Sequence, residues 1–194
     1  LEARRKNAEI EVLDCQAEGA DWKKLEERVE CSRPNIIVPS ALSTCNTYTV
    51  LRTLQIAKKV DPYIVTVAGG QHFTATALES LETYPEIDII VRGEGERTLV
   101  EIVQALDGEK PLSEVEGISF KHDGNIVQTP NRPLIENLDE LPLPGYHLIK
   151  DYMKEYHFTM MAGPKTRYAL IEASRGCYHN CTFCSQWRFW EGKW

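Results

Sequence analysis

The residues of this sequence best suited to chemistry are three cysteines near its carboxyl end. Cys177, Cys181 and Cys184 fall within eight residues and follow the pattern C-x3-C-x2-C. A tight group of thiols in a chain without an apolar signal segment favours metal binding or catalysis over a disulfide framework. Zinc usually takes four ligands from paired C-x2-C knuckles, whereas three thiolates in one short loop match three irons of a [4Fe–4S] cluster. The fourth iron would then be open to a substrate or cofactor.

The spacing by itself leaves two other interpretations open. His179 lies inside the same loop and could be a fourth ligand for zinc, although so short a loop would have to strain to turn the ring inward. The thiols could also be incidental. Further cysteines are scattered along predicted secondary structure, and we expect them to be packed thiols without a chemical role: Cys15, Cys31 and Cys45.

The cysteine pattern follows a predicted strand and has an aromatic residue before its last thiol, and it resembles the signature of the radical S-adenosylmethionine (SAM) superfamily. The resemblance implies that Cys177, Cys181 and Cys184 bind a [4Fe–4S] cluster and that Phe183 lies beside the adenine of SAM. In that superfamily, reductive cleavage of SAM yields methionine and a 5′-deoxyadenosyl radical, which abstracts a hydrogen atom from a small-molecule substrate. A reductant such as flavodoxin or ferredoxin would supply the electron. The later motifs of the superfamily would lie beyond Trp194, so we identify no catalytic residue and do not expect this chain alone to be active.

Predicted strands and helices alternate through residues 1–107, and these elements could position such a site. Short β-branched segments predict strands at 10–14, 35–41, 63–70 and 87–94. Apolar residues at helical spacing predict helices at 22–31, 49–60, 74–84 and 96–106. This alternation indicates a doubly wound parallel α/β domain, Rossmann-like with flavodoxin-type strand order. Residues 1–7 read as the tail of a helix with no strand before it, so we expect the first, central strand to be missing.

The rest of the chain changes character. Residues 108–165 are rich in proline and contain a hairpin signal with Asp123-Gly124 at its tip, which predicts an ordered connector with a small antiparallel ribbon. A further strand is predicted at 168–174, directly before the cysteine pattern. The radical SAM resemblance implies that residues 166–194 are the first strand and cluster loop of a partial TIM barrel that is incomplete at its carboxyl end.

Small residues gather at the carboxyl ends of three of the four predicted strands of the α/β domain, in the stretches PNIIVPSALST (34–44), VAGGQHFTAT (67–76) and VRGEGERTLVEI (91–102). Open α/β sheets bind ligands at the carboxyl ends of their strands, although such glycines are also ordinary tight turns. These stretches resemble the cobalamin-binding domain found ahead of many radical SAM barrels. The D-x-H-x-x-G motif of other cobalamin proteins is absent. The resemblance implies cobalamin contacts at Ser40, Ala41, Ser43, Thr44, Gly69, Gly70, His72, Gly93, Glu94 and Gly95.

Composition limits the class of partner. The chain has 194 residues and a formal net charge of −7, which disfavours non-specific binding to nucleic acid. It contains no run of about 18 apolar residues, so we expect no membrane span. The absence of a signal-peptide core predicts a cytoplasmic location.

Within the superfamily, the stretches RTLQIAKKV (52–60), VRGEGE (91–96) and CTFCSQWRFW (181–190) look like the anaerobic oxidative cyclases of magnesium-protoporphyrin IX monomethyl ester. That resemblance implies a tetrapyrrole substrate, a water-derived oxygen in the product, and SAM, cobalamin and a [4Fe–4S] cluster as cofactors. A cobalamin-dependent radical SAM methyltransferase is the first alternative. A non-catalytic corrinoid carrier with a structural metal and a zinc-stabilised regulatory domain are the others. Without a first strand, we expect weak cobalamin binding or none.

Overall fold

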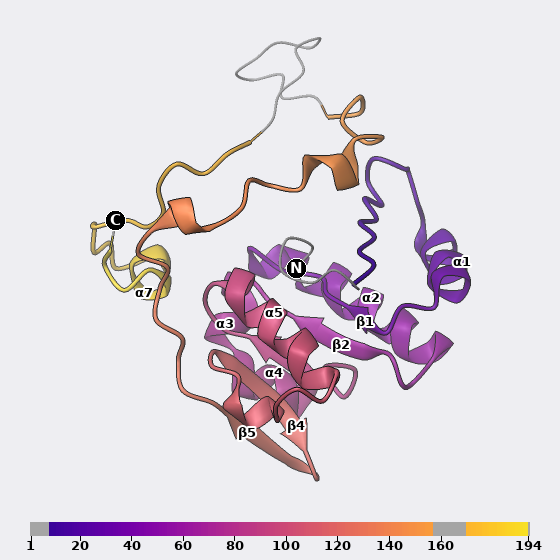
Figure 1. Cartoon of the computed structure of the whole chain (residues 1–194), viewed down its shortest axis with the longest axis horizontal. Coiled ribbons are helices and arrows are strands. Elements are labelled where there is room, and N and C mark those ends of the chain that lie inside the picture. The colour runs from indigo at the N-terminus through magenta and orange to yellow at the C-terminus, as the bar shows by residue number, and fades with distance from the viewer. Residues whose placement is uncertain (1–7, 157–169, 194) are drawn as a thin grey trace.

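The computed structural model describes residues 8–156 and 170–193, and a five-stranded sheet lies at its centre (Figure 1). The strands follow the order of the chain: β1 (Ile36–Ile37), β2 (Val65–Ala68), β3 (Ile89–Val91), β4 (Ile118–His122) and β5 (Asn125–Gln128). β1, β2 and β3 are parallel, whereas β4 and β5 run antiparallel to their neighbours. The α/β class is therefore confirmed, but the sheet is mixed and not wholly parallel.

Helices follow the parallel strands in alternation, as predicted. The α-helices are α1 (Trp22–Ser32), α2 (Thr47–Val60), α3 (Gln71–Ala75), α4 (Ala77–Thr83), α5 (Gly95–Leu106) and α7 (Gln186–Phe189). Short 3-10 helices lie in the connecting segments: η1 (Thr44–Asn46), η2 (Leu112–Glu114), η3 (Leu138–Glu140) and η4 (Tyr146–Ile149). The carboxylate of Asp21 caps α1 by accepting the backbone N–H of Lys24 at 2.8 Å.

One predicted helix, at 74–84, is divided in two. Thr76 separates α3 from α4 with φ −116° and ψ 25°, outside the helical region. Its hydroxyl donates to the carbonyl of His72 at 3.0 Å, and such local side-chain bonds compete with the regular helical ladder. After this break the chain continues as α4, and α3 is only a short helix directly after Gly69 and Gly70.

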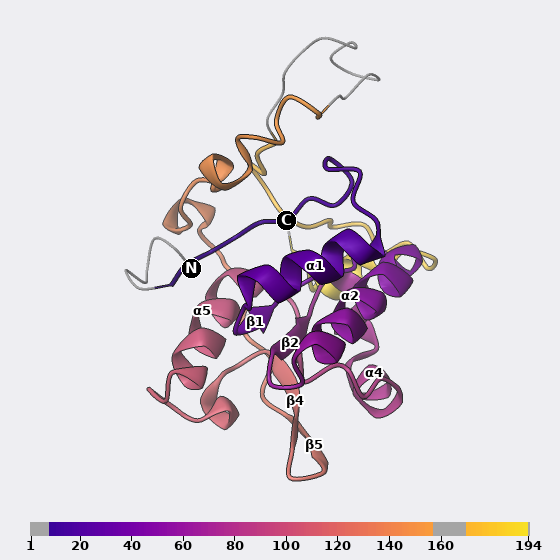
Figure 2. The same ribbon diagram turned by 90° about the vertical axis from the view of Figure 1, so that its right-hand side faces the viewer.

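The parallel strands are buried on both faces. On one face, Leu54 of α2 and Phe73 of α3 pack with Ile90 of β3. On the other face, Ile102 of α5 packs with Ile89 of β3. Neighbouring residues of a strand point to opposite faces, so a doubly covered strand needs an unbroken apolar run. α1 does not touch the sheet in the same way but packs along α2 (Figure 2).

The predicted hairpin is part of the central sheet. Asp123 and Gly124 at its tip have φ 49° and 77°, the positive values that a two-residue type I′ turn requires. β4 pairs with β3 in the register Ile90↔Ser119, so the hairpin extends the sheet beyond its parallel part. Arg92, the residue after β3, strengthens this attachment because its guanidinium donates to the carbonyl of Ile118 at 3.2 Å.

One predicted strand is not formed, and another is much shorter than predicted. Residues 10–14 are irregular because none of the described strands lies beside them to complete a backbone ladder. The predicted strand at 35–41 shortens to β1 and one isolated bridge, Ser40↔Gly69. Residues 1–7, predicted as the tail of a helix, lie outside the described residues.

The strand predicted at 168–174 is also absent over its described part. Residues 168–169 lie outside the described ranges, and 170–174 are irregular, with Leu170 and Ile171 72% and 67% exposed. A barrel strand is ordered by neighbours on both sides, and within the described residues no strand pairs with this segment. The described chain accordingly shows no barrel.

The prediction of packed thiols is wrong for Cys31 and Cys45, which are exposed, while Cys15 is half-buried. On α1 the buried face is marked by Leu25 and Val29, one helical turn apart. Cys31 lies two residues beyond Val29, roughly 200° further around the helix, and so points to the opposite side.

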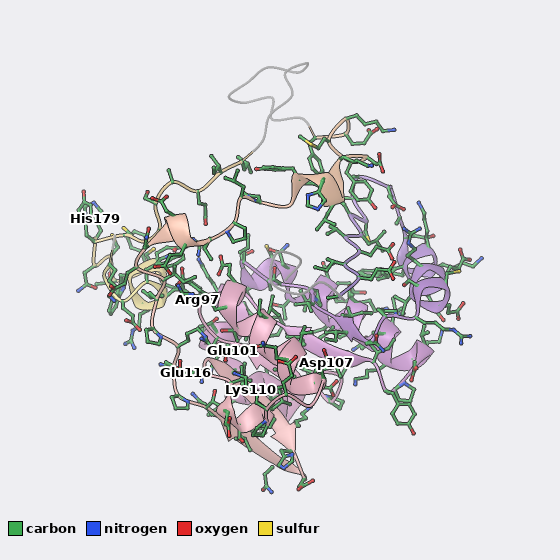
Figure 3. All side chains as sticks on the ribbon, in the orientation of Figure 1. Arg97, Glu101, Asp107, Lys110, Glu116 and His179 are labelled. Atoms are coloured by element: carbon green, nitrogen blue, oxygen red, sulfur yellow. The ribbon has the colours of Figure 1, made fainter. Side chains whose placement is uncertain are left out.

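A carboxylate on the outer side of α5 links the helix to the chain that follows it. Glu101 accepts from the ammonium of Lys110 at 2.5 Å and from the guanidinium of Arg132 at 2.8 Å (Figure 3). Burial raises the pKa of Glu101, but the two cations outweigh this and leave the pKa below its ordinary value. The ionised carboxylate is therefore favoured in the folded state.

We expect the stabilisation from Glu101 to depend on pH. A folded-state pKa that is lowered adds stability above the ordinary glutamate pKa of about 4.3 and loses it as the pH falls below that value. Glu101→Gln should therefore cost about 1 kcal/mol near neutral pH and nearly nothing near pH 3. Urea unfolding at both pH values measures the difference, with Glu30→Gln on the exposed side of α1 as control. An equal cost of Glu101→Gln at both pH values would contradict the argument.

Candidate functional site

The stretches of small residues after β1, β2 and β3 form three loops, which we call the first (40–44), second (69–74) and third (93–95). The first two loops are joined directly at the carboxyl edge of the sheet. Beyond the Ser40↔Gly69 bridge, the N–H of Ala41 donates to the carbonyl of Gly69 at 2.9 Å, and the N–H of His72 donates to the carbonyl of Ala41 at 3.3 Å. The hydroxyl of Thr44 and Nδ1 of His72 lie 3.2 Å apart. The two loops therefore form one surface with a common backbone network.

The third loop is joined to the second. The N–H of Gly93 donates to the hydroxyl of Thr74 at 3.1 Å. Gly93 has φ 75° and a Cβ there would meet no atom within 4 Å, so the backbone is open to an approaching group at this point. Gly95 begins α5, whose N-terminus carries a partial positive charge. The structure thus brings the three small-residue stretches together, as the sequence predicted.

Gly70 is the most constrained residue of this edge. Its φ is 93°, and a Cβ at this position would lie 2.4 Å from the carbonyl oxygen of Ala41. Both the left-handed backbone and the contact with the first loop therefore require glycine here. Ala41 itself is fully buried under the loop.

The hydroxyl side chains of the first loop lie on the open side of the edge. Ser40, Ser43 and Thr44 are exposed. The hydroxyl of Ser43 bonds with Oδ1 of Asn46 at 2.8 Å and lies 2.9 Å from the thiol of Cys45. Because the single hydroxyl hydrogen of Ser43 already goes to Asn46, Ser40 and Thr44 are the hydroxyls of this loop that could donate to oxygen atoms of a bound polar molecule.

Glu94 faces the connector and the cysteine segment. Its side chain is 5% exposed. One carboxylate oxygen accepts from the N–H of Ile135 at 2.5 Å, and the other accepts from the guanidinium of Arg175 at 2.8 Å. Both oxygens are thus engaged by the protein, so within this structure Glu94 bridges chain segments while its neighbours Gly93 and Gly95 form the loop surface.

Sequence reasoning missed Arg175. This residue binds Glu94 at 2.8 Å, Glu96 at 2.6 Å and Glu172 at 2.9 Å. Burial lowers the pKa of Arg175, but the three carboxylates outweigh it and raise the pKa above its ordinary value. The sequence places Arg175 two residues before Cys177, but no local pattern indicates its partners 79 and 81 residues away.

A second contact joins the cysteine segment to the glycine loops. The side-chain amides of Gln71 and Gln186 exchange two hydrogen bonds, of 3.2 and 3.1 Å. Gln186 begins α7, which lies close to α3 in the fold (Figure 1). Trp190 also donates its indole N–H to Gln186 at 2.9 Å. The cysteine segment is therefore attached to both the second and the third loop.

The predicted metal ligands lie in one closed loop, which we call the cysteine loop (177–193). The N–H of Cys177 donates to the carbonyl of Lys193 at 3.0 Å and closes it, and the N–H of Cys184 donates to the carbonyl of Cys181 at 3.1 Å. All three thiols are free, with Cys181 exposed and the others half-buried. The donor set has the chemistry of an iron–sulfur site. Among the described residues, no three Cys, His, Asp or Glu side chains converge closely enough to hold a metal ion.

Two residues of the cysteine loop had other expected roles. Phe183, predicted beside the adenine of SAM, is 91% exposed. His179, considered as a zinc ligand, lies on the outer side of the loop (Figure 3), where its ring contacts that of Tyr178 with centroids 4.3 Å apart. The described geometry gives His179 no part in a convergent metal site.

Two clefts border the cysteine loop. One, of about 470 Å³, lies between the α3–α4 segment 74–79 and residues 188–191. The other, of about 610 Å³, lies between the connector at 134–139 and the segment 173–175, with Glu94 in its wall. Both clefts depend on where the cysteine loop lies, since the loop or the segment before it provides one side of each.

The B12 binding domain family matches residues 2–103, a range that contains all three joined loops. The chain belongs to this family. Every helix within the described ranges is too short or too polar to cross a membrane.

Curated relatives have two kinds of activity. An uncharacterized methyltransferase from Pyrococcus horikoshii is 33% identical over 181 residues, which is 93% of this chain and 38% of the relative. An anaerobic magnesium-protoporphyrin IX monomethyl ester cyclase from Rubrivivax gelatinosus is 36% identical over 186 residues, 94% of this chain and 32% of the relative. The chain therefore spans less than two fifths of the length of these relatives.

A solved structure agrees with the fold. The cobalamin-dependent S-adenosylmethionine radical enzyme OxsB, determined with aqua-cobalamin and S-adenosylmethionine bound, matches with a TM-score of 0.69 and 25% identity over 92% of this chain and 24% of that chain. Together with the sequence relatives, this match confirms the resemblance to cobalamin-dependent radical SAM enzymes.

We expect the two glycines of the edge to respond differently to the same change. Gly70→Ala should lower the free energy of unfolding by about 3 kcal/mol, because it adds a clash to a left-handed backbone. Gly93→Ala, the matched control, places Cβ in open space and should cost only about 1 kcal/mol. Denaturant unfolding of both variants measures the difference. Equal costs would show that the contact between Gly70 and Ala41 does not constrain the edge.

Proposed function

We propose that this chain forms the cobalamin-binding part of a cobalamin-dependent radical SAM enzyme, and that Cys177, Cys181 and Cys184 bind its [4Fe–4S] cluster. One observation carries the proposal. The cysteine loop is hydrogen-bonded through Gln186, and the segment before it through Arg175, to two of the three loops that a cobalamin-binding domain would use. Two cofactors that must act on one substrate would therefore be anchored at the same edge of the sheet.

The carboxyl edge fits a large, flat cofactor. Backbone atoms form much of its surface, and the absence of a side chain at Gly93 leaves open space above the third loop. The hydroxyls of Ser40 and Thr44 are exposed at the same edge. Bound cobalamin would supply a methyl group or a further redox centre. Residues proposed to contact it are the accessible ones of the three loops: Ser40, Ser43, Thr44, Gly70, His72, Gly93 and Gly95. Ala41 and Gly69, which the sequence also predicted as contacts, are buried and would support the loops from beneath. Glu94 would not contact the cofactor but would hold the third loop in place through its hydrogen bonds with Ile135 and Arg175.

The cysteine loop fits an iron–sulfur cluster by the chemistry of its donors. Three free thiols and no fourth cysteine in the loop match a cluster with one open iron. The cluster, with SAM, would supply a 5′-deoxyadenosyl radical after reduction by a flavodoxin or ferredoxin. Metal binding draws its ligands together and contributes to folding, so convergence of the thiols is expected on loading. Phe183 would then contact SAM.

The relatives support two activities. The cyclase from Rubrivivax gelatinosus favours oxidative cyclisation of magnesium-protoporphyrin IX monomethyl ester, and the relative from Pyrococcus horikoshii favours methyl transfer. We place the cyclase first because its identity is higher, 36% against 33%, over nearly the same share of this chain, 94% against 93%. The fate of the SAM methyl group separates them, since only a methyltransferase moves it to its product. In this proposal residues 1–107 bind cobalamin, 108–165 connect, and 166–194 begin the barrel.

We expect cobalamin affinity to depend on the open side of the first loop. Thr44→Trp places a large ring on an exposed position of the proposed contact surface, and it should weaken binding of hydroxocobalamin by about tenfold or more. Spectral titration of the full-length protein encoded by the native gene measures this. Glu30→Trp, on the exposed side of α1, should bind as the wild type does. Unchanged affinity in Thr44→Trp would place the cofactor elsewhere.

We also expect iron binding to need all three clustered thiols. After anaerobic reconstitution of the full-length protein, the wild type should carry about four irons and four sulfides, and Cys177→Ser, Cys181→Ser and Cys184→Ser should each lose most of them. Cys31→Ser, which removes an exposed thiol far from the loop, should retain the wild-type content. The assay is iron and sulfide analysis with visible absorption. A wild type that takes up zinc but no sulfide-bound iron would overturn the proposal.

A further inference from the structure

We propose that Arg175 is a positioning residue that sets where the cysteine loop lies over the cobalamin-binding edge, acting through Glu94. The inference deepens the proposed function, on which its meaning for catalysis rests. Arg175 lies between the irregular segment 170–174 and Cys177. On one side of it the hydroxyl of Tyr146 donates to the carbonyl of Leu170, and on the other the N–H of Cys177 donates to the carbonyl of Lys193 within the cysteine loop itself. The charged contact of this segment with the cobalamin-binding edge is made by the guanidinium of Arg175.

The contact differs from an ordinary surface ion pair. The side chain of Arg175 is 16% exposed, and that of Glu94 is 5% exposed. Exposed ion pairs contribute little because water competes and both side chains lose freedom, whereas breaking a buried pair leaves an uncompensated charge. Arg175 also binds Glu96 through a different nitrogen, in the fork geometry that lysine cannot reproduce. A displacement of Arg175 that leaves Glu94 buried would therefore leave its carboxylate without a counter-ion.

Glu94 connects this pair to the third loop. It directly follows Gly93 and directly precedes α5, so its position is fixed by the sheet and the helix behind it. Its second oxygen accepts from the N–H of Ile135 at 2.5 Å, which leaves the carboxylate little freedom to follow Arg175 elsewhere. The sheet thus fixes Glu94, Glu94 holds Arg175, and Arg175 positions the chain that leads to Cys177.

The cysteine loop can respond as a unit to this anchor. The bond from the N–H of Cys177 to the carbonyl of Lys193 closes it, and the N–H of Gly192 donates to the carbonyl of Trp187 at 2.9 Å. Two other side-chain contacts attach the cysteine loop: the neutral amide pair of Gln71 and Gln186, and a long ion pair of 4.0 Å between the exposed side chains of Lys193 and Glu136, which contributes little because water competes for both groups. A neutral pair of this kind is weaker than a charge-assisted fork, so we assign the larger part of the positioning to Arg175.

The test compares two arginines of the same region. Arg175→Gln removes the anchor, and Arg188→Gln removes the same charge from an exposed position on α7, where Arg188 lies 5.2 Å from the ring centroid of Trp187. Alkylation of the reduced, metal-free protein by iodoacetamide at constant pH is followed thiol by thiol with mass spectrometry. Cys177 and Cys184 are half-buried and report displacement of the loop, whereas exposed Cys181 is an internal reference.

We expect Arg175→Gln to raise the alkylation rates of Cys177 and Cys184 by about tenfold, with Cys181 changed by less than about twofold. Arg188→Gln should leave all three rates near those of the wild type. Glu94→Gln should reproduce the effect, and the double variant should add little to either single one, because both disrupt the same contact. Wild-type rates in Arg175→Gln, or an equal effect of Arg188→Gln, would overturn the inference.

A second measurement separates positioning from folding and from the proposed function. In the full-length reconstituted protein, Arg175→Gln should keep the wild-type content of iron and sulfide and the wild-type affinity for hydroxocobalamin. It should change the magnetic coupling between cob(II)alamin and the reduced cluster in electron paramagnetic resonance spectra. If the alkylation rates change but the magnetic coupling does not, Arg175 positions the loop only in the metal-free protein. That result would contradict its proposed role in the enzyme with both cofactors bound. A wild type that binds neither cofactor refutes the proposed function, while the thiol rates still decide the contact.

Discussion

The parallel pairing of β1, β2 and β3 is the constraint on which the rest of the structure depends. Parallel strands begin at the same edge of a sheet and end at the same edge, so the loops that follow them must emerge side by side. That geometry brings residues near 40, 70 and 93 into contact although they are far apart in sequence. Short backbone bonds such as the one from Ala41 to Gly69 are possible only because of this arrangement. Gly70 has no room for a side chain for the same reason.

The end of β3 also anchors the antiparallel hairpin formed by β4 and β5. Arg92 follows β3 directly and donates to backbone carbonyls of the hairpin region, including that of Ile118. Burial lowers the pKa of Arg92, yet the guanidinium has carbonyl oxygens as partners and ties β4 to the end of β3. The chain leaving β5 is thereby directed back past α5, where Ile135 can donate to Glu94. One strand end therefore organises the third loop, the hairpin and the start of the connector.

The cysteine loop depends on this framework more than on its own structure. It contains one short helix, α7, and is closed by backbone bonds between its ends, but within the described residues it makes no strand pairing with the sheet. Its place is defined by side chains, above all the fork of Arg175 on two carboxylates at the start of α5. The position of the loop over the sheet is therefore set by contacts between side chains and not by backbone pairing with a strand.

Features that depend on local physics could be predicted from the amino-acid sequence. Apolar periodicity located α1, α2 and α5, and Asp123-Gly124 located the hairpin turn. The spacing of three cysteines predicts an iron–sulfur site, and this stays a prediction. Strands were predicted with less success, because residues 10–14 and 170–174 have strand-like side chains but no partner backbone in the described structure. Period-two patterns report which side chains suit a strand, and only a neighbouring strand can supply its hydrogen bonds.

Tertiary structure alone decided how the site is joined. The pairing of β3 with β4, the division of the helix at Thr76, and the contact of Arg175 with Glu94 all depend on groups far away in sequence or on competition between local bonds. Charge in the sequence shows that Arg175 needs a counter-ion but not which of the 29 acidic residues provides it. That choice is made by burial, since the carboxylate already fixed between β3 and α5 is the one that gains most from a guanidinium when water is excluded.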